Sequence, residues 1–277
     1  MTAGEATVEA TTTEERRAAL EAIAAEVRAC TRCRLAEGRT RAVPGEGHPD
    51  TEVLFVGEGP GQTEDAQGRP FVGRAGELLV KLLASIGWRR QEVFITNIVK
   101  CRPPGNRDPE PDEIAACAPY LQRQLEALDP AVVVTLGRFS MAHFRPGERI
   151  TQIHGTHAPA PAATGARDAL AYALFHPAAA LRSTDVERQS YDDMAGLPRV
   201  LTAARERRAG ARPALQGDAI PPIIPPDPGD DAPTLSERDE HGQPTAGQRL
   251  GRHAPPHHPA RWSRRDRQEH VRVRVRR

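Results

Sequence analysis

Four cysteines are the residues of this 277-residue sequence whose type and spacing most clearly predict chemistry. Cys30 and Cys33 form a C-x2-C pair, whereas Cys101 and Cys117 follow with fifteen residues between them. Four sulfur ligands suit Zn²⁺ or an iron–sulfur cluster. Because zinc ribbons usually carry two tight pairs, the wide second pair favours a cluster. Four unrelated buried thiols are the alternative.

A glycine-rich segment, GEGPG at residues 57–61, follows the short apolar run VLFV. It lacks the G-x-G-x-x-G register of a dinucleotide fingerprint, because Pro60 interrupts the turn and no helix is expected directly after Gly61. Glycines in such a turn still let the backbone come close to a flat or anionic ligand. The segment is therefore a candidate wall of a binding pocket.

Three further residues have side chains that suit recognition of a nucleobase. Phe71, in an Arg69-Pro70-Phe71 turn, could stack on a base or be an ordinary core residue. Asn97 offers a donor and an acceptor that match a pyrimidine edge, and a turn or cap role is its alternative. His176, just before Pro177, could donate to a developing oxyanion or simply occupy a turn.

The elements that must position these residues alternate between strands and helices. Apolar runs predict four buried strands: Val53–Val56, Val93–Thr96, Ala131–Leu136 and Ala171–Phe175. Helical periodicity and end signals predict four main helices: Thr13–Cys30, Ala75–Ile86, Pro111–Leu128 and Asp185–Arg208. We therefore expect an α/β three-layer sandwich with a central, mainly parallel four-stranded sheet. The candidate pocket residues follow strand ends, where ligands bind in such sheets.

Composition limits the organisation of the chain. Hydrophobic residues make up 38% of it, which is low for one packed unit, and the net charge of +1 points to no partner. We expect one domain at 13–208 and a low-complexity, disordered basic tail at 209–277, whose arginine-rich end (260–277) either contacts DNA phosphates or has no role. Because the sequence has no signal-like or membrane-spanning apolar run, we expect a cytoplasmic protein, and structural disulfides are disfavoured in that compartment. We expect a monomer, because no sequence feature suggests an oligomer.

Taken together, these segments resemble family 4 uracil-DNA glycosylases, the iron–sulfur branch of the uracil-DNA glycosylase superfamily. The resemblance covers roughly residues 15–205, and the four cysteines match that family's cluster ligands in order and spacing. Five motifs carry it: GE-x-PG at 57–61, GRPFVGRAG at 68–76, Thr96-Asn97, KCRPP-x-NRDP at 100–109 and HP-x-x-x-LR at 176–182.

The resemblance implies a DNA-repair enzyme that flips uracil out of single- or double-stranded DNA and hydrolyses its N-glycosidic bond. His176 would donate to uracil O2, Asn97 would pair with the uracil edge, and Phe71 would stack on the base. Glu58, Gly59 and Pro60 would line the pocket. Gly59 stands where the better-known branch has a water-orienting aspartate, so the catalytic role of Glu58 is an open expectation.

The same resemblance implies a structural 4Fe-4S cluster on Cys30, Cys33, Cys101 and Cys117. Arg102, Arg107 and Arg182 would meet DNA, and Leu181 would wedge into the gap left by the flipped base. Glu64, between the pocket turn and Phe71, is expected to crowd the C5 methyl group of thymine. The alternatives are a non-catalytic DNA-binding relative, an iron–sulfur electron-transfer protein and a zinc protein.

Overall fold

The computed structural model of the protein describes residues 11–211. The described residues all belong to the first of two units into which the chain divides, Met1–Pro225. Helix α9 (Thr184–Ala211) continues through positions 209–211, and the rest of the predicted tail lies outside the described residues.

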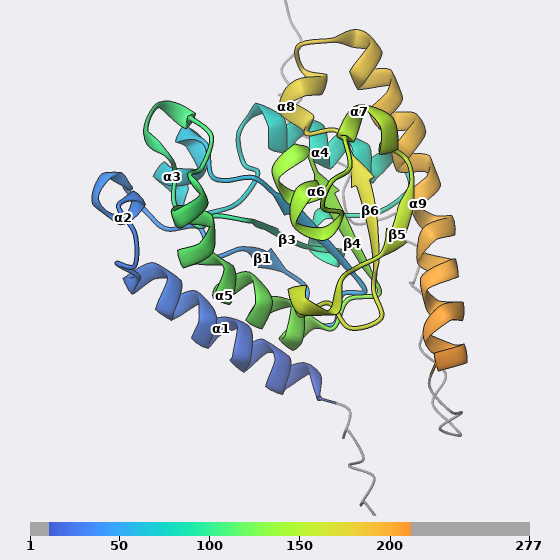
Figure 1. Ribbon diagram of the computed structural model, residues 1–277, viewed down its shortest axis with the longest axis horizontal. Helices are drawn as coiled ribbons and strands as arrows, with labels where there is room; N and C mark the ends of the chain where they lie inside the picture. The colour runs from blue at the N-terminus through green and yellow to red at the C-terminus, as the bar shows by residue number, and fades with distance from the viewer. Residues whose placement is uncertain (1–10, 212–277) are drawn as a thin grey trace, which may run out of the picture. The chain divides into compact units, whose positions relative to one another are not determined.

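The core of the first unit is one six-stranded sheet with the order β1-β3-β2-β4-β6-β5 (Figure 1). The strands are β1 Glu46–Gly47, β2 Val53–Gly57, β3 Phe94–Asn97, β4 Val132–Leu136, β5 His157–Pro159 and β6 Leu170–Leu174. The four predicted strands are the four central ones, and they pair in parallel as expected. The predicted count of four was too low, because two short antiparallel strands border the sheet.

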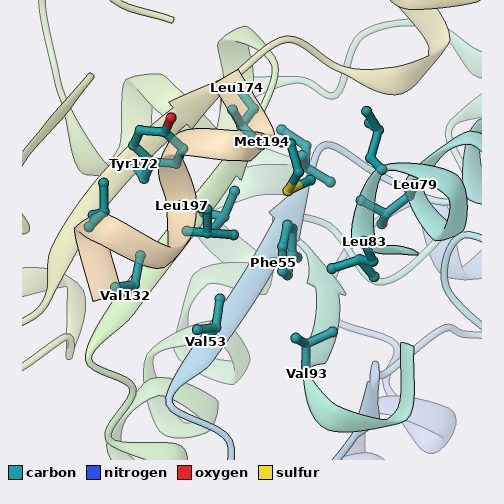
Figure 2. Packing of buried hydrophobic residues seen from close by; sticks show 14 of the residues in the cluster. Val53, Phe55, Leu79, Leu83, Val93, Val132, Tyr172, Leu174, Met194 and Leu197 are labelled. Atoms are coloured by element: carbon teal, nitrogen blue, oxygen red, sulfur yellow. The ribbon is translucent and has the colours of Figure 1, made fainter. Parts of the chain in front are cut away.

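Two hydrophobic clusters cover the two faces of the sheet, which confirms three layers. On one face Phe55 of β2 packs with residues of α4 (Arg74–Ser85) and α9, as Figure 2 shows for Leu83 and Leu197. On the other face Leu54 packs with residues of α1 (Thr13–Ala29) and α5 (Pro111–Leu128). Alternate side chains of one strand thus point to opposite layers.

The long helices begin and end at residues whose types favour helix ends. Thr12 caps α1 through a reciprocal capping box with Glu15, and Pro111 occupies the first turn of α5. Gly87, with a φ of +75°, follows the end of α4. The shorter helices are α2 Leu35–Gly38, α3 Gln62–Gln67, α6 Arg138–Phe144, α7 Ile150–Ile153 and α8 Pro177–Ala180, with 3₁₀ turns at Arg90–Glu92, Pro104–Asn106 and Ala162–Thr164.

Helix α3 corrects one expectation from the sequence. It starts directly after Gly61, where no helix was expected. Its six residues, QTEDAQ, carry no apolar periodicity, so the sequence pattern could not reveal it. The helix is fixed instead by Asp65, whose buried carboxylate accepts the backbone N–H of Thr40 at 2.9 Å.

In the described part of the chain, no helix combines the length and the apolar character that a membrane crossing needs.

Candidate active site

A cavity of about 640 Å³ opens at the edge of the sheet where the central strands end. Glu58 follows β2, Asn97 closes β3, Gly137 follows β4, and His176 lies two residues after β6. All four line the cavity. The parallel register, which pairs Gly57 with Asn97 and Leu136 with Leu174, brings these distant segments together.

The cavity gathers all the residues predicted to bind substrate. These are Glu58, Gly59, Pro60, Glu64, Phe71, Asn97 and His176. Of the predicted DNA-binding residues, Arg107 and Arg182 also line it, whereas Arg102 and Leu181 do not. Leu181 is 39% exposed, which is unusual for a large apolar side chain here. Placement alone assigns no role, so the roles of these residues stay predictions.

The Asn97 side chain is poised for a ligand. It is only 1% exposed, yet its Oδ1 has no hydrogen-bond partner among the described residues. A buried acceptor left unpaired costs about 1–3 kcal/mol, so proteins rarely leave one without a reason. Asn97 itself lines the cavity, where a bound N–H group would satisfy this unpaired oxygen.

The backbone of Asn97 is held from behind by Lys100, a buried residue for which sequence reasoning predicted no role. Its ammonium group donates to the Asn97 carbonyl at 2.8 Å and to Gln124 Oε1 at 2.7 Å. Its own backbone N–H points to Cys117 Sγ at 3.2 Å. Burial lowers the pKa of Lys100 to about 7. The residue thus joins the pocket to the cysteines.

Gly57 has no room for a side chain. A Cβ atom there would lie 2.6 Å from Phe71 Cζ and nearer still to Asn97 Oδ1. The glycine therefore lets the aromatic ring and the amide meet at the end of β2.

His176 is held as a neutral ring in one tautomer. Its Nδ1 accepts the backbone N–H of Ala178 at 3.1 Å, so the proton of the neutral ring must sit on Nε2. Burial, reinforced by the charge of Arg182 and opposed by that of Glu64, lowers the pKa of His176 to about 4. The ring is therefore a neutral hydrogen-bond donor at physiological pH.

Phe71 combines the two alternatives that the sequence left open, since it belongs to the core and also lines the cavity. Its ring centroid lies 5.7 Å from that of His176. Its φ of +49° is unusual for a bulky residue, and such strain needs support from its surroundings. Arg90 supplies it by donating to the carbonyls of Phe71 and Pro70 at 2.9 and 2.5 Å.

The three carboxylates of the cavity have different surroundings. Glu64 Oε1 accepts the backbone N–H groups of Val72 and Gly73 at 2.9 and 2.8 Å, which fixes it at the start of α4. Asp108 pairs with Arg138. The carboxyl of Glu58 has no hydrogen-bond partner among the described residues. Burial, reinforced by the charge of Asp108 and opposed by that of Arg138, raises its pKa.

Two predicted phosphate-binding arginines are already engaged within the protein. Arg107 donates both terminal nitrogens to Glu113, whose side chain is completely buried, at 2.9 and 2.6 Å. Arg102 donates to Asn106 Oδ1 at 2.7 Å. Arg107 therefore holds the loop after β3 in place, rather than offering a free cation.

The four cysteines lie around one small cavity. Cys30 and Cys33 follow α1, Cys101 lies in the loop after β3, and Cys117 lies on α5. Hydrogen-bond donors face two of the sulfurs closely, from Arg39 Nη1 to Cys101 at 3.1 Å and from the Lys100 backbone to Cys117 at 3.2 Å. Burial raises the pKa of the free Cys117 thiol to about 11. As the side chains of residues 11–211 stand, no group of three or more His, Cys, Asp or Glu is arranged to hold a single metal ion.

The structure adds residues that sequence reasoning did not select. Asn106, Asp108, Arg138, Ile150 and Phe175 also line the cavity. Asn106 and Asp108 lie inside the KCRPP-x-NRDP motif, so their neighbourhood was indicated but their role was not. Arg138 could have been found by its position directly after Gly137, at the end of the third predicted strand.

Comparison with known proteins places this cavity in context. A family model described as the uracil DNA glycosylase superfamily matches residues 44–195. The type-4 uracil-DNA glycosylase of Sulfurisphaera tokodaii is 46% identical over 178 residues, which cover 63% of this chain and 81% of that protein. A protein of the same name from Saccharolobus solfataricus is 56% identical over 125 residues, or 45% of this chain and 58% of that protein.

A third relative, the type-4 uracil-DNA glycosylase of Pyrobaculum aerophilum, is 40% identical over 189 residues. This match covers 65% of the chain and 95% of the relative. Most of that relative's length therefore has a counterpart here. All the residues that line the 640 Å³ cavity, from Glu58 to Arg182, fall within the region that the family model matches.

Proposed function

Because the chain belongs to the uracil DNA glycosylase superfamily, we propose that it hydrolyses the bond between uracil and deoxyribose in DNA and leaves an abasic site. This reaction belongs to DNA repair, because it removes a base that DNA should not contain, and the relatives are named type-4 uracil-DNA glycosylases. The substrate is a uracil base flipped out of single- or double-stranded DNA, because an enzyme cannot reach the glycosidic bond of a stacked base.

The buried, unpartnered Oδ1 of Asn97 is the observation that carries this proposal. Uracil presents an N3–H donor between two carbonyl acceptors, and an asparagine amide can face that edge with its own acceptor and donor. Phe71 would stack on the flipped ring. Phe71 and Asn97 lie on the same wall of the cavity, because a side chain at Gly57 would collide with both of them.

The neutral His176 ring would stabilise the leaving group. When the C1′–N1 bond breaks, the sugar gains oxocarbenium character and uracil leaves as an anion. The pKa of His176 lies far below neutrality, so the ring is neutral at physiological pH and its Nε2–H group would donate to uracil O2 as a neutral donor. Glu58, whose carboxyl is not engaged by a hydrogen bond, is the group we propose to orient the attacking water.

We also propose that Cys30, Cys33, Cys101 and Cys117 hold a 4Fe-4S cluster. The four sulfurs surround one cavity, and N–H donors directed at sulfur favour the thiolate state that iron binds. The bound cluster would act as a structural cross-link between the end of α1, the loop after β3, and α5. Iron analysis and a brown colour would support it, whereas a colourless zinc protein would refute it.

The proposal includes a monomer in the cytoplasm, where reducing conditions keep such cysteines available to a metal. Arg182 and Leu181 would contact the DNA beside the flipped base. Leu181 would enter the gap in the stack, which gives its exposed apolar side chain a use.

The deciding experiment is uracil release from a labelled uracil-containing oligonucleotide by cluster-loaded protein, with Asn97→Ala as the matched variant. We expect release by the wild type and a loss of about 100- to 1000-fold in the variant, the effect of removing one preorganised polar group. Tight binding of uracil-containing DNA without release would instead identify a non-catalytic relative. Equal release by both proteins would place the pocket elsewhere.

A further inference from the structure

Three arginines line the 640 Å³ cavity, and they differ in how firmly the protein holds them. Arg107 is committed to the buried carboxylate of Glu113. Arg182 acts on His176 through its charge. Arg138, the first residue of α6, pairs with Asp108, and both side chains are largely exposed, at 62% and 61%. Arg138 is thus the cavity arginine with a weak, solvent-accessible ion pair.

An exposed ion pair of this kind contributes only about 0–1 kcal/mol, so its partners can exchange at little cost. The backbone of Asp108 is anchored. Its carbonyl accepts from Arg107 at 2.8 Å, and Arg107 is anchored to Glu113. Asp108 therefore stays at the cavity when the pair opens, whereas the long Arg138 side chain is free to reach another anion.

The position of Arg138 is set by its neighbours. Gly137, at a φ of +87°, has no room for a side chain, because a Cβ atom would lie 2.8 Å from His176 Cβ. Gly137 therefore packs closely against His176, and Arg138 is the next residue of the chain. Its guanidinium lies 4.7 Å from the centroid of the Phe139 ring, a cation–π contact with the next residue of the chain.

A base bound between Phe71, Asn97 and His176 leaves its sugar and flanking phosphates at the mouth of the cavity. We propose that Arg138 binds a backbone phosphate of the flipped nucleotide and that Asp108 holds the guanidinium until DNA arrives, so that Asp108 and DNA compete for one cation. This inference rests on the proposed function, because it takes the flipped uridine as the occupant. Arginine forms strong bidentate pairs with phosphate, and binding also releases counterions from DNA.

The test is a double-mutant cycle with Arg138→Gln, Asp108→Asn and the double variant. Arg17→Gln serves as control, because Arg17 is an exposed arginine that pairs with Glu14 and does not line the cavity. Affinity for a duplex with a tetrahydrofuran abasic-site analogue is measured by fluorescence anisotropy at several salt concentrations. The kcat and KM of uracil release are measured in parallel.

We expect Arg138→Gln to weaken binding about tenfold and to reduce the slope of log K against log salt by about one. Asp108→Asn should tighten binding, and it should do so much less in the Arg138→Gln background. The control should match the wild type. Unchanged affinity and salt slope in Arg138→Gln, or an Asp108→Asn variant that binds no tighter than wild type, overturns the inference.

The outcomes separate this inference from the proposed function. If wild-type protein releases no uracil, the proposed function fails, and the binding cycle still reports whether Arg138 meets a phosphate. If the wild type releases uracil and Arg138→Gln behaves like the wild type, only the role of Arg138 fails. If both single variants and the double variant lose affinity equally, the pair merely supports the loop, which also refutes competition.

Discussion

At the scale of single residues, the tautomer and the pKa of His176 are set by the groups around its ring. One backbone N–H fixes the tautomer, while burial and the Arg182 cation keep the ring neutral. A lowered pKa means that the unfolded chain binds more protons than the folded one between about pH 4 and the ordinary histidine value. The contribution of His176 to the free energy of unfolding is therefore fully present above that pH window and is lost as pH falls through it.

This leads to a prediction for His176 that NMR can check. Its imidazole resonances should titrate near pH 4, and the Arg182→Gln variant should raise that pKa, because a neighbouring cation is removed. Uracil release should show no loss due to His176 between neutral pH and about pH 5. A wild-type titration near 6.5, or no upward shift in Arg182→Gln, would contradict this account. Arg188→Gln is the control, because Arg188 pairs with Asp185 near the start of α9 and does not line the cavity.

A second residue-scale prediction concerns exclusion of thymine. The two backbone N–H groups at the start of α4 hold the Glu64 carboxylate rigidly against the cavity. Glu64→Ala should therefore permit release of thymine, whereas Glu64→Gln, which keeps the size of the side chain, should not. Release is measured on matched uracil- and thymine-containing duplexes. A Glu64→Ala enzyme that remains inert on thymine would refute this role.

At the scale of elements, Glu113 joins three segments that carry cysteines or the pocket wall. It lies in the first turn of α5, one turn before Cys117. Its carboxylate accepts from Arg107, in the loop after β3, and from Arg34, next to Cys33, at 3.0 Å. Chiefly through Arg107, the pKa of Glu113 is lowered to about 2. Its stabilising effect is therefore present above the ordinary pKa of a glutamate and is lost as pH falls toward 2.

We expect Glu113→Gln to lower the free energy of unfolding of the cluster-loaded protein by about 1–3 kcal/mol, because a buried, charge-assisted network is broken. Urea denaturation at pH 7 measures this. The difference in free energy of unfolding between Glu113→Gln and the wild type should become smaller at low pH, where the wild-type carboxylate becomes protonated. Asp112→Asn is a suitable control, since Asp112 also pairs with Arg34 but is 69% exposed. Equal stability of Glu113→Gln and wild type would disprove the network's importance.

The elements that sequence predicted well are those with strong apolar patterns. The runs at 53–56 and 131–136 correspond to the central strands because both of their faces are buried. Glu46–Gly47 and His157–Pro159 have no such pattern, and they are strands only because β3 and β6 offer them an edge. Asn97 and His176 could be anticipated at strand ends, whereas the Arg138–Asp108 pair joins residues thirty positions apart and is set by the tertiary fold alone.

At the scale of the whole molecule, the cavity and the cysteines occupy a continuous part of the chain. All lie between Cys30 and Arg182, within the described residues. The Pyrobaculum aerophilum relative is matched over 95% of its length by 65% of this chain. A uracil-DNA glycosylase of that type is thus complete in far fewer residues than this sequence has.

A protein that ends at Ala211 should therefore keep a kcat for uracil release within about twofold of the full chain, since one domain carries its own core and site. We expect any effect of the arginine-rich end at 260–277 to be on DNA binding and not on kcat. If it contacts phosphates, the shortened protein should show a smaller slope of log K against log salt, by about one for each lost contact; an unchanged slope would mean that it makes none. A large drop in kcat, in a shortened protein that retains its iron and its unfolding midpoint, would show that the catalytic unit extends beyond residue 211.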